Sequence, residues 1–159
     1  MIHDTVTPLM PPQLAAAAQL HALCFPDDPW SEHSLRELLE SPGIAGWVIT
    51  DAEIPAQLAG LLLTRLAADE AEILTLCVAP LQRHRGAAGR LLETALPALA
   101  ALGARRLFLE VAQDNEAARG LYHRYGFSRI GYRPAYYRRA NGARAAALVL
   151  ALDLSPPKN

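Results

Sequence analysis

Cysteine, long apolar runs and nucleotide-binding glycine motifs are scarce or missing in this sequence, and each shortage excludes a class of protein. The two cysteines, Cys24 and Cys77, lie far apart without C-x-x-C or Cys/His spacing, which argues against a disulfide framework and against a metal site. Apolar runs such as Leu58–Leu63 are too short to span a bilayer. Neither G-x-G-x-x-G nor G-K-[ST] occurs, which weakens a Rossmann or P-loop interpretation.

A strong overall charge is also missing. The formal net charge is −1, so a general nucleic-acid-binding surface is not expected. The first residues do not resemble a signal peptide, and together with the free cysteines this predicts a reduced, cytoplasmic setting without membrane contact. Arginines nevertheless gather at Arg83, Arg85 and Arg90, which favours a local anion site.

What is present is a globular composition, with 52% hydrophobic residues in 159. We expect a single domain over residues 1–159, with 153–159 as a frayed tail. Ser31 is the expected N-cap of the second helix, and Ser34-x-x-Glu37 offers a capping box one turn later. Periodicity predicts helices over 11–25, 31–41, 87–102 and 115–125, and strands over 46–50, 57–67, 72–78, 105–112, 130–137 and 146–152.

This order predicts a mixed α/β sheet whose interior βαβ unit, Ile73–Val111, forms a parallel or splayed central pair. The strand Ile73–Val78 leads into a basic loop, and a helix then opens at Ala87. The first turn of a helix has unpaired N–H donors and partial positive charge, and the small side chains at Gly86 and Ala88 let an anion approach them. The sequence therefore predicts a phosphate site here, although an ordinary strand-to-helix turn remains the alternative.

A second informative stretch, Leu107–Phe127, reads LFLEVAQDNEAARGLYHRYGF. A carboxylate among apolar neighbours loses hydration and becomes a better proton acceptor, so Glu110 is a candidate general base, or else an outward-facing residue on a sheet edge. Asp114 and Asn115 are both residue types that cap the N-terminus of a helix, and we expect Asp114 to cap the helix that follows. Tyr122 is a candidate proton donor or a core aromatic. Cys77 is expected to be a buried small hydrophobe rather than a nucleophile.

Both stretches resemble the GNAT acetyltransferase superfamily. Arg83–Ala88 fits its R/Q-x-x-G-x-G/A motif, and the second stretch resembles its LEV…N-x-x-A-x-x-LY-x-x-x-GF signature. Three further segments, FPDDPWS at Phe25–Ser31, EAEILTLCV at Glu70–Val78 and Arg133-Pro-Ala-Tyr-Tyr, resemble the bacterial RimI-type ribosomal-protein-alanine N-acetyltransferases. The resemblance implies a GNAT fold, with a mostly antiparallel sheet, a splayed parallel pair and about four helices.

The resemblance also implies roles for individual residues. Glu110 would be the general base and Tyr122 the general acid, while Trp30, Tyr136 and Tyr137 would line the acceptor entrance. Acetyl-CoA would be the cosubstrate and no metal would be needed. The residues implied to bind the coenzyme are Leu76, Cys77, Val78, Arg83, His84, Arg85, Gly86, Ala87, Ala88, Gly89 and Asn115.

By this resemblance the acceptor would be a protein α-amino group. The RimI-type target it implies is the N-terminal alanine of a small-subunit ribosomal protein. Two other functions stay open: a GNAT enzyme that acetylates a small-molecule amine or a lysine, and a non-catalytic acyl-CoA-binding module. Asp27 and Asp28 are inserted in the FPWS turn, which leaves the shape of the acceptor entrance undetermined.

Overall fold

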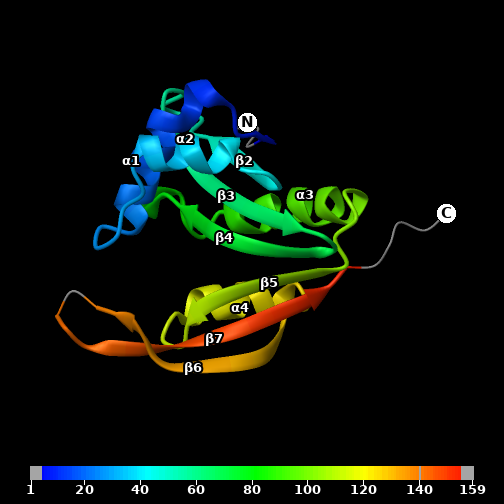
Figure 1. The fold of residues 1–159 in the computed structure, drawn as a ribbon. Coiled ribbons are helices and arrows are strands. Elements are labelled where there is room, and N and C mark those ends of the chain that lie inside the picture. Colours follow the sequence, from blue (N-terminus) through cyan, green and yellow to red (C-terminus); the bar gives the residue numbers. More distant parts are fainter. Residues whose placement is uncertain (1–4, 140, 155–159) are drawn as a thin grey trace.

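The chain folds around one seven-stranded sheet (Figure 1). A computed structural model describes residues 5–139 and 141–154. The helices are α1 Leu14–Cys24, α2 Glu32–Glu40, α3 Ala87–Ala101 and α4 Glu116–Arg124, with short 3-10 turns η1 Pro11–Gln13 and η2 Pro80–Gln82. The strands are β1 Val6–Pro8, β2 Ile44–Thr50, β3 Leu58–Ala67, β4 Glu70–Val78, β5 Arg106–Ala112, β6 Ser128–Arg138 and β7 Arg144–Asp153.

The sheet has the order β1-β2-β3-β4-β5-β7-β6, and only β4 and β5 pair in parallel. Their pairing is confined to the first residues of each strand, from Glu70 opposite Arg106 to Glu72 opposite Phe108. Beyond that point β4 runs on to Val78 and β5 to Ala112 without pairing to each other. The two ribbons diverge in Figure 1, so the predicted splayed pair and the mixed, mostly antiparallel sheet are confirmed.

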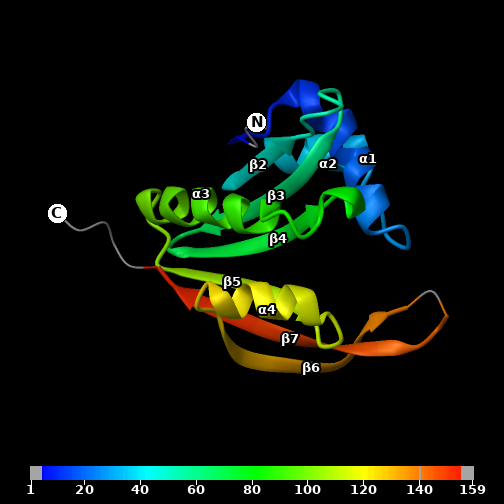
Figure 2. The same ribbon diagram turned by 180° about the vertical axis from the view of Figure 1, so that it is seen from behind.

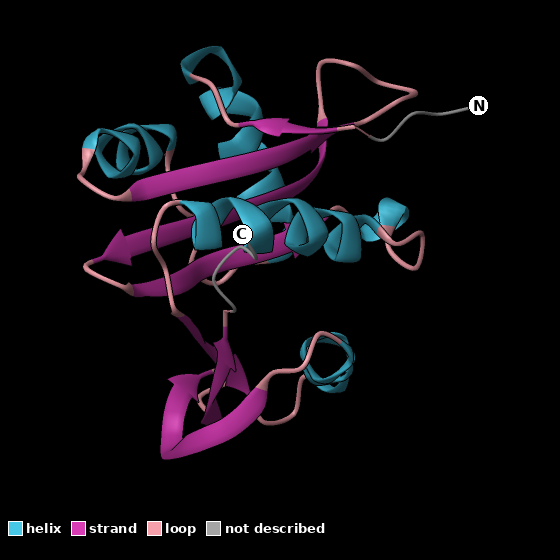
Figure 3. Ribbon diagram, turned by 90° about the vertical axis from the view of Figure 1, so that its right-hand side faces the viewer, coloured by secondary structure: helices cyan, strands magenta, loops and turns pink. Residues whose placement is uncertain are grey.

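Helices cover both faces of the sheet, as the side view in Figure 3 shows. Strand β3 explains why, because its side chains alternate between the two faces and are apolar on both. Leu61 and Leu63 pack with α1 and α2 in one buried cluster, whereas Leu62 packs with α3 in the other. The view from behind in Figure 2 shows α3 and α4 on their common side of the molecule. The site described below lies on this side.

The sequence predicted the elements well but not all of their limits. The first predicted helix is split into η1 and α1. Strand β1 was not predicted, because its three residues are too few to show an alternating pattern. The predicted tail begins too early, since Asp153 closes β7 and the Leu154 N–H donates to the Arg105 carbonyl at 2.8 Å. Residues 155–159 of that tail lie outside the described residues.

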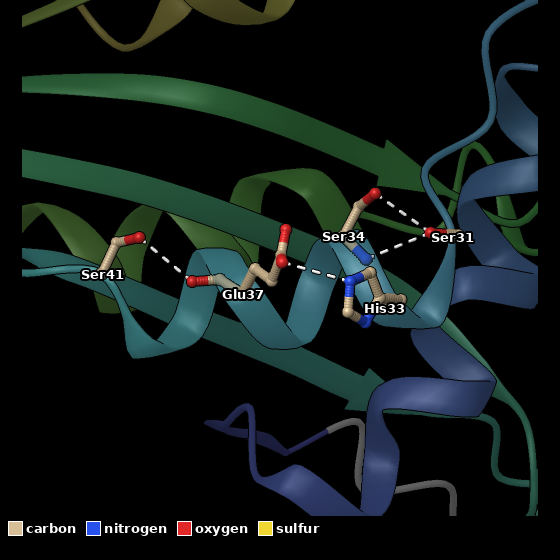
Figure 4. Close-up of polar contacts among 5 residues, drawn as sticks. All are labelled: Ser31, His33, Ser34, Glu37 and Ser41. Atoms are coloured by element: carbon tan, nitrogen blue, oxygen red, sulfur yellow. Dashed lines mark hydrogen bonds and ion pairs between the residues drawn. The ribbon is translucent and has the colours of Figure 1, made fainter.

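Helix α2 shows which cap the sequence selects (Figure 4). Ser31 is the N-cap as predicted, and its hydroxyl accepts a hydrogen bond from the Ser34 N–H at 3.1 Å. The predicted capping box from Ser34 to Glu37 is wrong, because Ser34 already lies inside the helix. Glu37 instead pairs with His33 at 3.1 Å. No helix within residues 5–139 and 141–154 is long and apolar enough to cross a membrane.

Candidate active site

A cavity of about 940 Å³ opens where β4 leaves β5. The last residues of β4 and the start of α3 form one wall, and α4 forms the opposite wall. Of the residues predicted to bind a coenzyme, all except Arg85 line it. The complete lining is Cys24, Phe25, Leu76, Cys77, Val78, Gln82, Arg83, His84, Gly86, Ala87, Ala88, Gly89, Arg90, Glu93, Asn115, Ala117, Ala118, Leu121, Tyr122, Arg124 and Tyr125.

The loop before α3 has the backbone shape that an anion site requires. His84 and Gly86 both have positive φ, 64° and 82°, on either side of Arg85, and such left-handed positions are part of the backbone nests that bind anions. Gly86 is the N-cap of α3, so the first-turn N–H groups of Ala87, Ala88 and Gly89 point away from the helix body. A Cβ at Gly86 would lie only 3.2 Å from Arg90 Nη1. The positive φ and the limited space explain why residue 86 is a glycine, as the predicted phosphate site requires.

Arginines stiffen this loop through local hydrogen bonds. Arg83 Nε donates to the Val78 carbonyl at 3.1 Å, and Arg90 Nη1 donates to the Arg85 carbonyl at 2.9 Å. Arg85 itself turns away from the cavity and donates to Gln82 Oε1 at 3.2 Å. The guanidinium groups therefore add positive charge around the loop while holding its backbone in place.

One face of α4 completes the cavity and was largely missed from sequence. Leu121 and Tyr122 lie four and three residues before the C-cap Tyr125, which places each of them on the same side of the helix as Tyr125. Tyr125 reaches α3, where its hydroxyl donates to Glu93 at 2.7 Å, and a Cβ at Gly89 would lie 2.6 Å from that hydroxyl oxygen. Gly89 thus allows the two helices to approach. The 3.6-residue spacing could have revealed this face.

The cap of α4 differs from the expectation. Asn115, not Asp114, is the N-cap, and its side-chain oxygen accepts from the Ala118 N–H at 3.2 Å. Asp114 instead forms an ion pair with Arg139, which the sequence separation concealed. Because capping uses the Asn115 amide oxygen, the amide nitrogen is the group that can donate to a ligand in the cavity.

Tyr122 is buried in the cavity wall and packs edge-to-face against Phe127, with ring centroids 5.4 Å apart. It is therefore both a core aromatic and a cavity residue, so the two interpretations from sequence are compatible. Burial raises the pKa of the Tyr122 hydroxyl, and the nearby Tyr137 adds to the increase. The hydroxyl consequently keeps its proton at neutral pH.

Glu110 lies on the part of β5 that pairs with β7 but no longer with β4, so it faces the opening between the two separated strands. Its side chain is 25% exposed, and its Oε1 pairs with Arg133 Nη2 at 3.1 Å. Tyr137 is half-buried nearby: burial and then the Glu110 charge raise the pKa of its hydroxyl. Tyr137 thus lies near enough to both Glu110 and Tyr122 to interact with each electrostatically. Of these three residues, only Tyr122 lines the cavity.

The position of Arg133 depends on an irregularity in β6. The pairing of β6 with β7 shifts register between Arg133 and Tyr137, and Ala135 within the shift has a φ of 52°. Such bulges change the direction of side chains along a strand. The Arg133 guanidinium lies over the Tyr136 ring at 5.3 Å, and the Tyr136 and Tyr137 rings meet edge-to-face. The bulge therefore gathers Arg133, Tyr136 and Tyr137 beside Glu110.

Trp30 does not line the cavity and instead anchors the turn after α1. Its backbone N–H donates to His21 Nδ1 at 3.0 Å, and its ring stacks on the His21 ring at 4.5 Å. His21 is buried, and burial lowers the pKa of its imidazole, with Asp28 partly opposing the effect. The structure therefore gives Trp30 a packing role that the sequence did not predict.

The two cysteines lie together in the cavity wall despite their separation in sequence. Cys77 is buried, as predicted, and both side chains are free thiols. Cys77 belongs to the buried cluster against which Cys24 packs. Within the described residues, no three His, Cys, Asp or Glu side chains cluster in a way that could hold a metal ion.

Comparisons with known proteins agree with this architecture. The sequence model of the acetyltransferase (GNAT) family matches residues 14–127. A "[Ribosomal protein bS18]-alanine N-acetyltransferase" of Haemophilus ducreyi is 40% identical over 86 residues, which are 54% of this chain and 59% of that protein. A Salmonella typhimurium protein of the same name is 31% identical over 156 residues, covering 96% of this chain and 99% of that protein.

The crystal structure of the ribosomal-protein-S18-alanine N-acetyltransferase from Escherichia coli superposes with a TM-score of 0.85 and 28% identity. It covers 98% of this chain and 96% of the other. The family match extends over most of the sequence and includes both the basic loop and the α4 wall of the cavity. The chain belongs to the GNAT acetyltransferase family.

Proposed function

We propose that this protein transfers the acetyl group of acetyl-CoA to a protein N-terminal α-amino group, with the N-terminal alanine of a small-subunit ribosomal protein as the acceptor. The observation that carries the proposal is the cavity between the separated ends of β4 and β5, with an anion-binding loop at one end and a buried tyrosine in its wall. The names of the bacterial relatives support the choice of acceptor. Such an acceptor places the enzyme in the cytoplasm.

The cavity suits a long ligand with a pyrophosphate. Positive φ at His84 and Gly86, the small residues that open α3, and Arg83 provide backbone donors and positive charge for the phosphates. Leu76, Cys77 and Val78 pair with β3 on one side but lie beyond the part of β4 that pairs with β5. The backbone polar groups on their β5 side can therefore bind the amides of the pantetheine arm. Asn115 can donate from its amide nitrogen. Acetyl-CoA supplies an activated acyl thioester.

Glu110 and Tyr122 handle the protons of the transfer in this proposal. Glu110 accepts a proton from the acceptor ammonium, directly or through water, so that the neutral amine can attack the acetyl carbonyl. An α-amino group has a pKa of about 7.7–8.0, so a modest base is sufficient. Tyr122 donates a hydrogen bond and then a proton to the sulfur that leaves. Its raised pKa keeps the donor protonated, and direct transfer needs no protein nucleophile.

The acceptor approaches past Tyr136 and Tyr137, which the β6 bulge places beside Glu110. Tyr136 is exposed, and nearly all of β6 faces solvent, which favours an extended peptide over a small enclosed substrate. Glu93 is the single acidic residue in the described cavity lining, and its carboxylate already accepts from Tyr125. Glu110, on the acceptor side, is likewise engaged, by Arg133, so neither carboxylate is free to bind a polyamine. The contact of Trp30 with the acceptor stays a prediction, since Trp30 anchors the turn after α1 and does not line the described cavity.

An acetyl-CoA assay with an acceptor panel tests the proposal. The panel contains peptides that begin with Ala, Ser or Met, a peptide with a blocked N-terminus and an internal lysine, and spermidine. We expect the Ala-starting peptide to have the highest kcat/KM. Preference for the lysine peptide or spermidine would replace the proposal with the rival enzymatic function. Coenzyme binding without any turnover would instead favour the non-catalytic module.

A further inference from the structure

The two cysteines form a cluster that acetyl transfer does not use. Cys24 is the last residue of α1, and Cys77 lies near the end of β4. Both line the cavity, Cys77 is 6% exposed, and Cys24 is partly buried. In the proposed reaction residues 76–78 act through their backbone, so neither thiol has a role there. Two adjacent thiols in a ligand cavity therefore need a separate explanation.

The sulfur atoms share their surroundings with a cation. Cys24 Sγ lies 3.4 Å from the Val78 carbonyl oxygen, and Arg83 Nε donates to the same oxygen at 3.1 Å. The pKa of the Cys24 thiol is lowered to about 7, first by the hydrogen bond from Cys77 and then by Arg83, against the opposing effect of burial. The same hydrogen bond and burial raise the pKa of Cys77. The surroundings thus favour ionisation of Cys24 over ionisation of Cys77, which makes Cys24 the more nucleophilic of the two thiols.

We propose that Cys24 and Cys77 are an oxidative modification site, at which a hydroperoxide oxidises Cys24 and Cys77 closes a disulfide in the cavity wall. The pairing of a cavity-exposed thiol beside an arginine with a buried partner thiol is the geometry that carries this proposal. The dithiol chemistry is independent of the proposed acetyl transfer. Only its effect on acetyl-CoA binding rests on that function.

Two balanced steps give the disulfide. The Cys24 thiolate attacks the terminal oxygen of the hydroperoxide, so an S–O bond forms and the O–O bond breaks. The alkoxide that leaves becomes an alcohol by taking up, through solvent, the proton that Cys24 released on ionisation. The Cys77 sulfur then attacks Cys24 sulfur, an S–S bond forms, and the hydroxide that leaves combines with the Cys77 proton as water. Two thiols and one hydroperoxide thus yield one disulfide, one alcohol and one water.

The disulfide would reshape the coenzyme wall. A disulfide has no S–H group, so its formation removes the hydrogen bond that Cys24 donates to the Val78 carbonyl, and it brings the two sulfurs to about 2.05 Å. That carbonyl lies in the segment to which we assign the pantetheine arm. Oxidation should therefore weaken acetyl-CoA binding, and bound acetyl-CoA should cover Cys24 and slow oxidation.

The test treats the whole protein with tert-butyl hydroperoxide, denatures it, alkylates remaining thiols and measures intact mass and linked peptides. We expect both thiols to disappear together and a single peptide pair joining Cys24 to Cys77. In Cys77→Ser, Cys24 should accumulate as a sulfenic acid that dimedone traps, whereas in Cys24→Ser the remaining Cys77 should resist oxidation. Two persistent thiols in the treated wild type, a disulfide between molecules, or equal oxidation of Cys77 without Cys24 would overturn the proposal.

A second readout separates this proposal from the proposed function. Saturating acetyl-CoA, which has no free thiol, should slow disulfide formation by about tenfold or more. If the protein acetylates the Ala-starting peptide but keeps both thiols after peroxide treatment, only the dithiol proposal is wrong. If the protein forms the disulfide but never binds acetyl-CoA, the proposed function is wrong and the dithiol proposal stands.

Discussion

The two walls of the cavity are built in different ways. On the β4–α3 wall the groups that face the ligand are backbone atoms and small residues, and their supporting hydrogen bonds join residues close in sequence, as in Arg83 to Val78 and Arg90 to Arg85. Beside the opposite wall, which α4 forms, the candidate catalytic side chains meet from distant segments, as in the Glu110–Arg133 pair just outside the cavity lining. In the proposed function the first wall binds the coenzyme, and the side chains beside the second carry out the transfer.

The largest effect should come from blocking the backbone wall with Gly86→Glu. The new side chain adds bulk and negative charge at the proposed phosphate site, and it forces a non-glycine residue to a φ of 82°. We expect acetyl-CoA affinity, measured by calorimetry, to fall by about 100-fold or more, equivalent to about 3 kcal/mol.

Gly103→Glu is the matched control for backbone strain. Gly103 also has a positive φ, 101°, but lies beyond the other end of α3, where a Cβ would meet no atom within 4 Å. The Gly103→Glu variant should be less stable than wild type but should keep the wild-type affinity for acetyl-CoA. Equal losses of affinity in the two variants would show that strain, not the phosphate site, causes the effect.

The chemical wall should respond in turnover rather than in coenzyme affinity. Tyr122→Phe keeps the ring that packs against Phe127 and removes only the hydroxyl. We expect kcat to fall by about 10- to 1000-fold, within the range of general acid catalysis, with little change in acetyl-CoA affinity. Tyr132→Phe is the control, since this tyrosine is exposed on β6 and packs with Arg129. Wild-type kcat in Tyr122→Phe would make Tyr122 a packing residue only.

The same contrast explains what the sequence could predict. The basic loop and the splayed strands were predictable, because Gly86, the small residues after it and the βαβ order act over short stretches. The Glu110–Arg133 pair was not, since it depends on the β6–β7 register and the bulge at Ala135. The contact between Cys24 and Cys77 likewise requires α1 to pack on β4, a tertiary fact that no local pattern contains.

A smaller effect is expected at the turn that carries Trp30. Burial lowers the pKa of His21 below its ordinary value of 6.5, so the unfolded chain binds the proton more readily than the folded one. The contribution of neutral His21 is complete above pH 6.5 and is lost as the pH falls below that value. Thermal unfolding at pH 7.5 and 5.5 should show a smaller pH dependence in His21→Asn than in wild type.

His33→Asn is the control for that measurement, because His33 is largely exposed and pairs only with the neighbouring Glu37. It should leave most of the wild-type difference between pH 7.5 and 5.5 in place. A difference that disappears in His33→Asn but persists in His21→Asn would contradict the role given to the buried imidazole.

The proton-accepting role of Glu110 is the most direct test of the division between a binding wall and a chemical wall. The measurement is the pH profile of kcat/KM for wild type and Glu110→Gln on an Ala-starting peptide, with acetyl-CoA affinity determined in parallel. We predict unchanged coenzyme affinity and a rate deficit that is largest below pH 7 and narrows above pH 8, where the acceptor amine is already neutral. Superimposable pH profiles would contradict the account, and a uniform deficit at every pH would reduce Glu110 to a positioning residue.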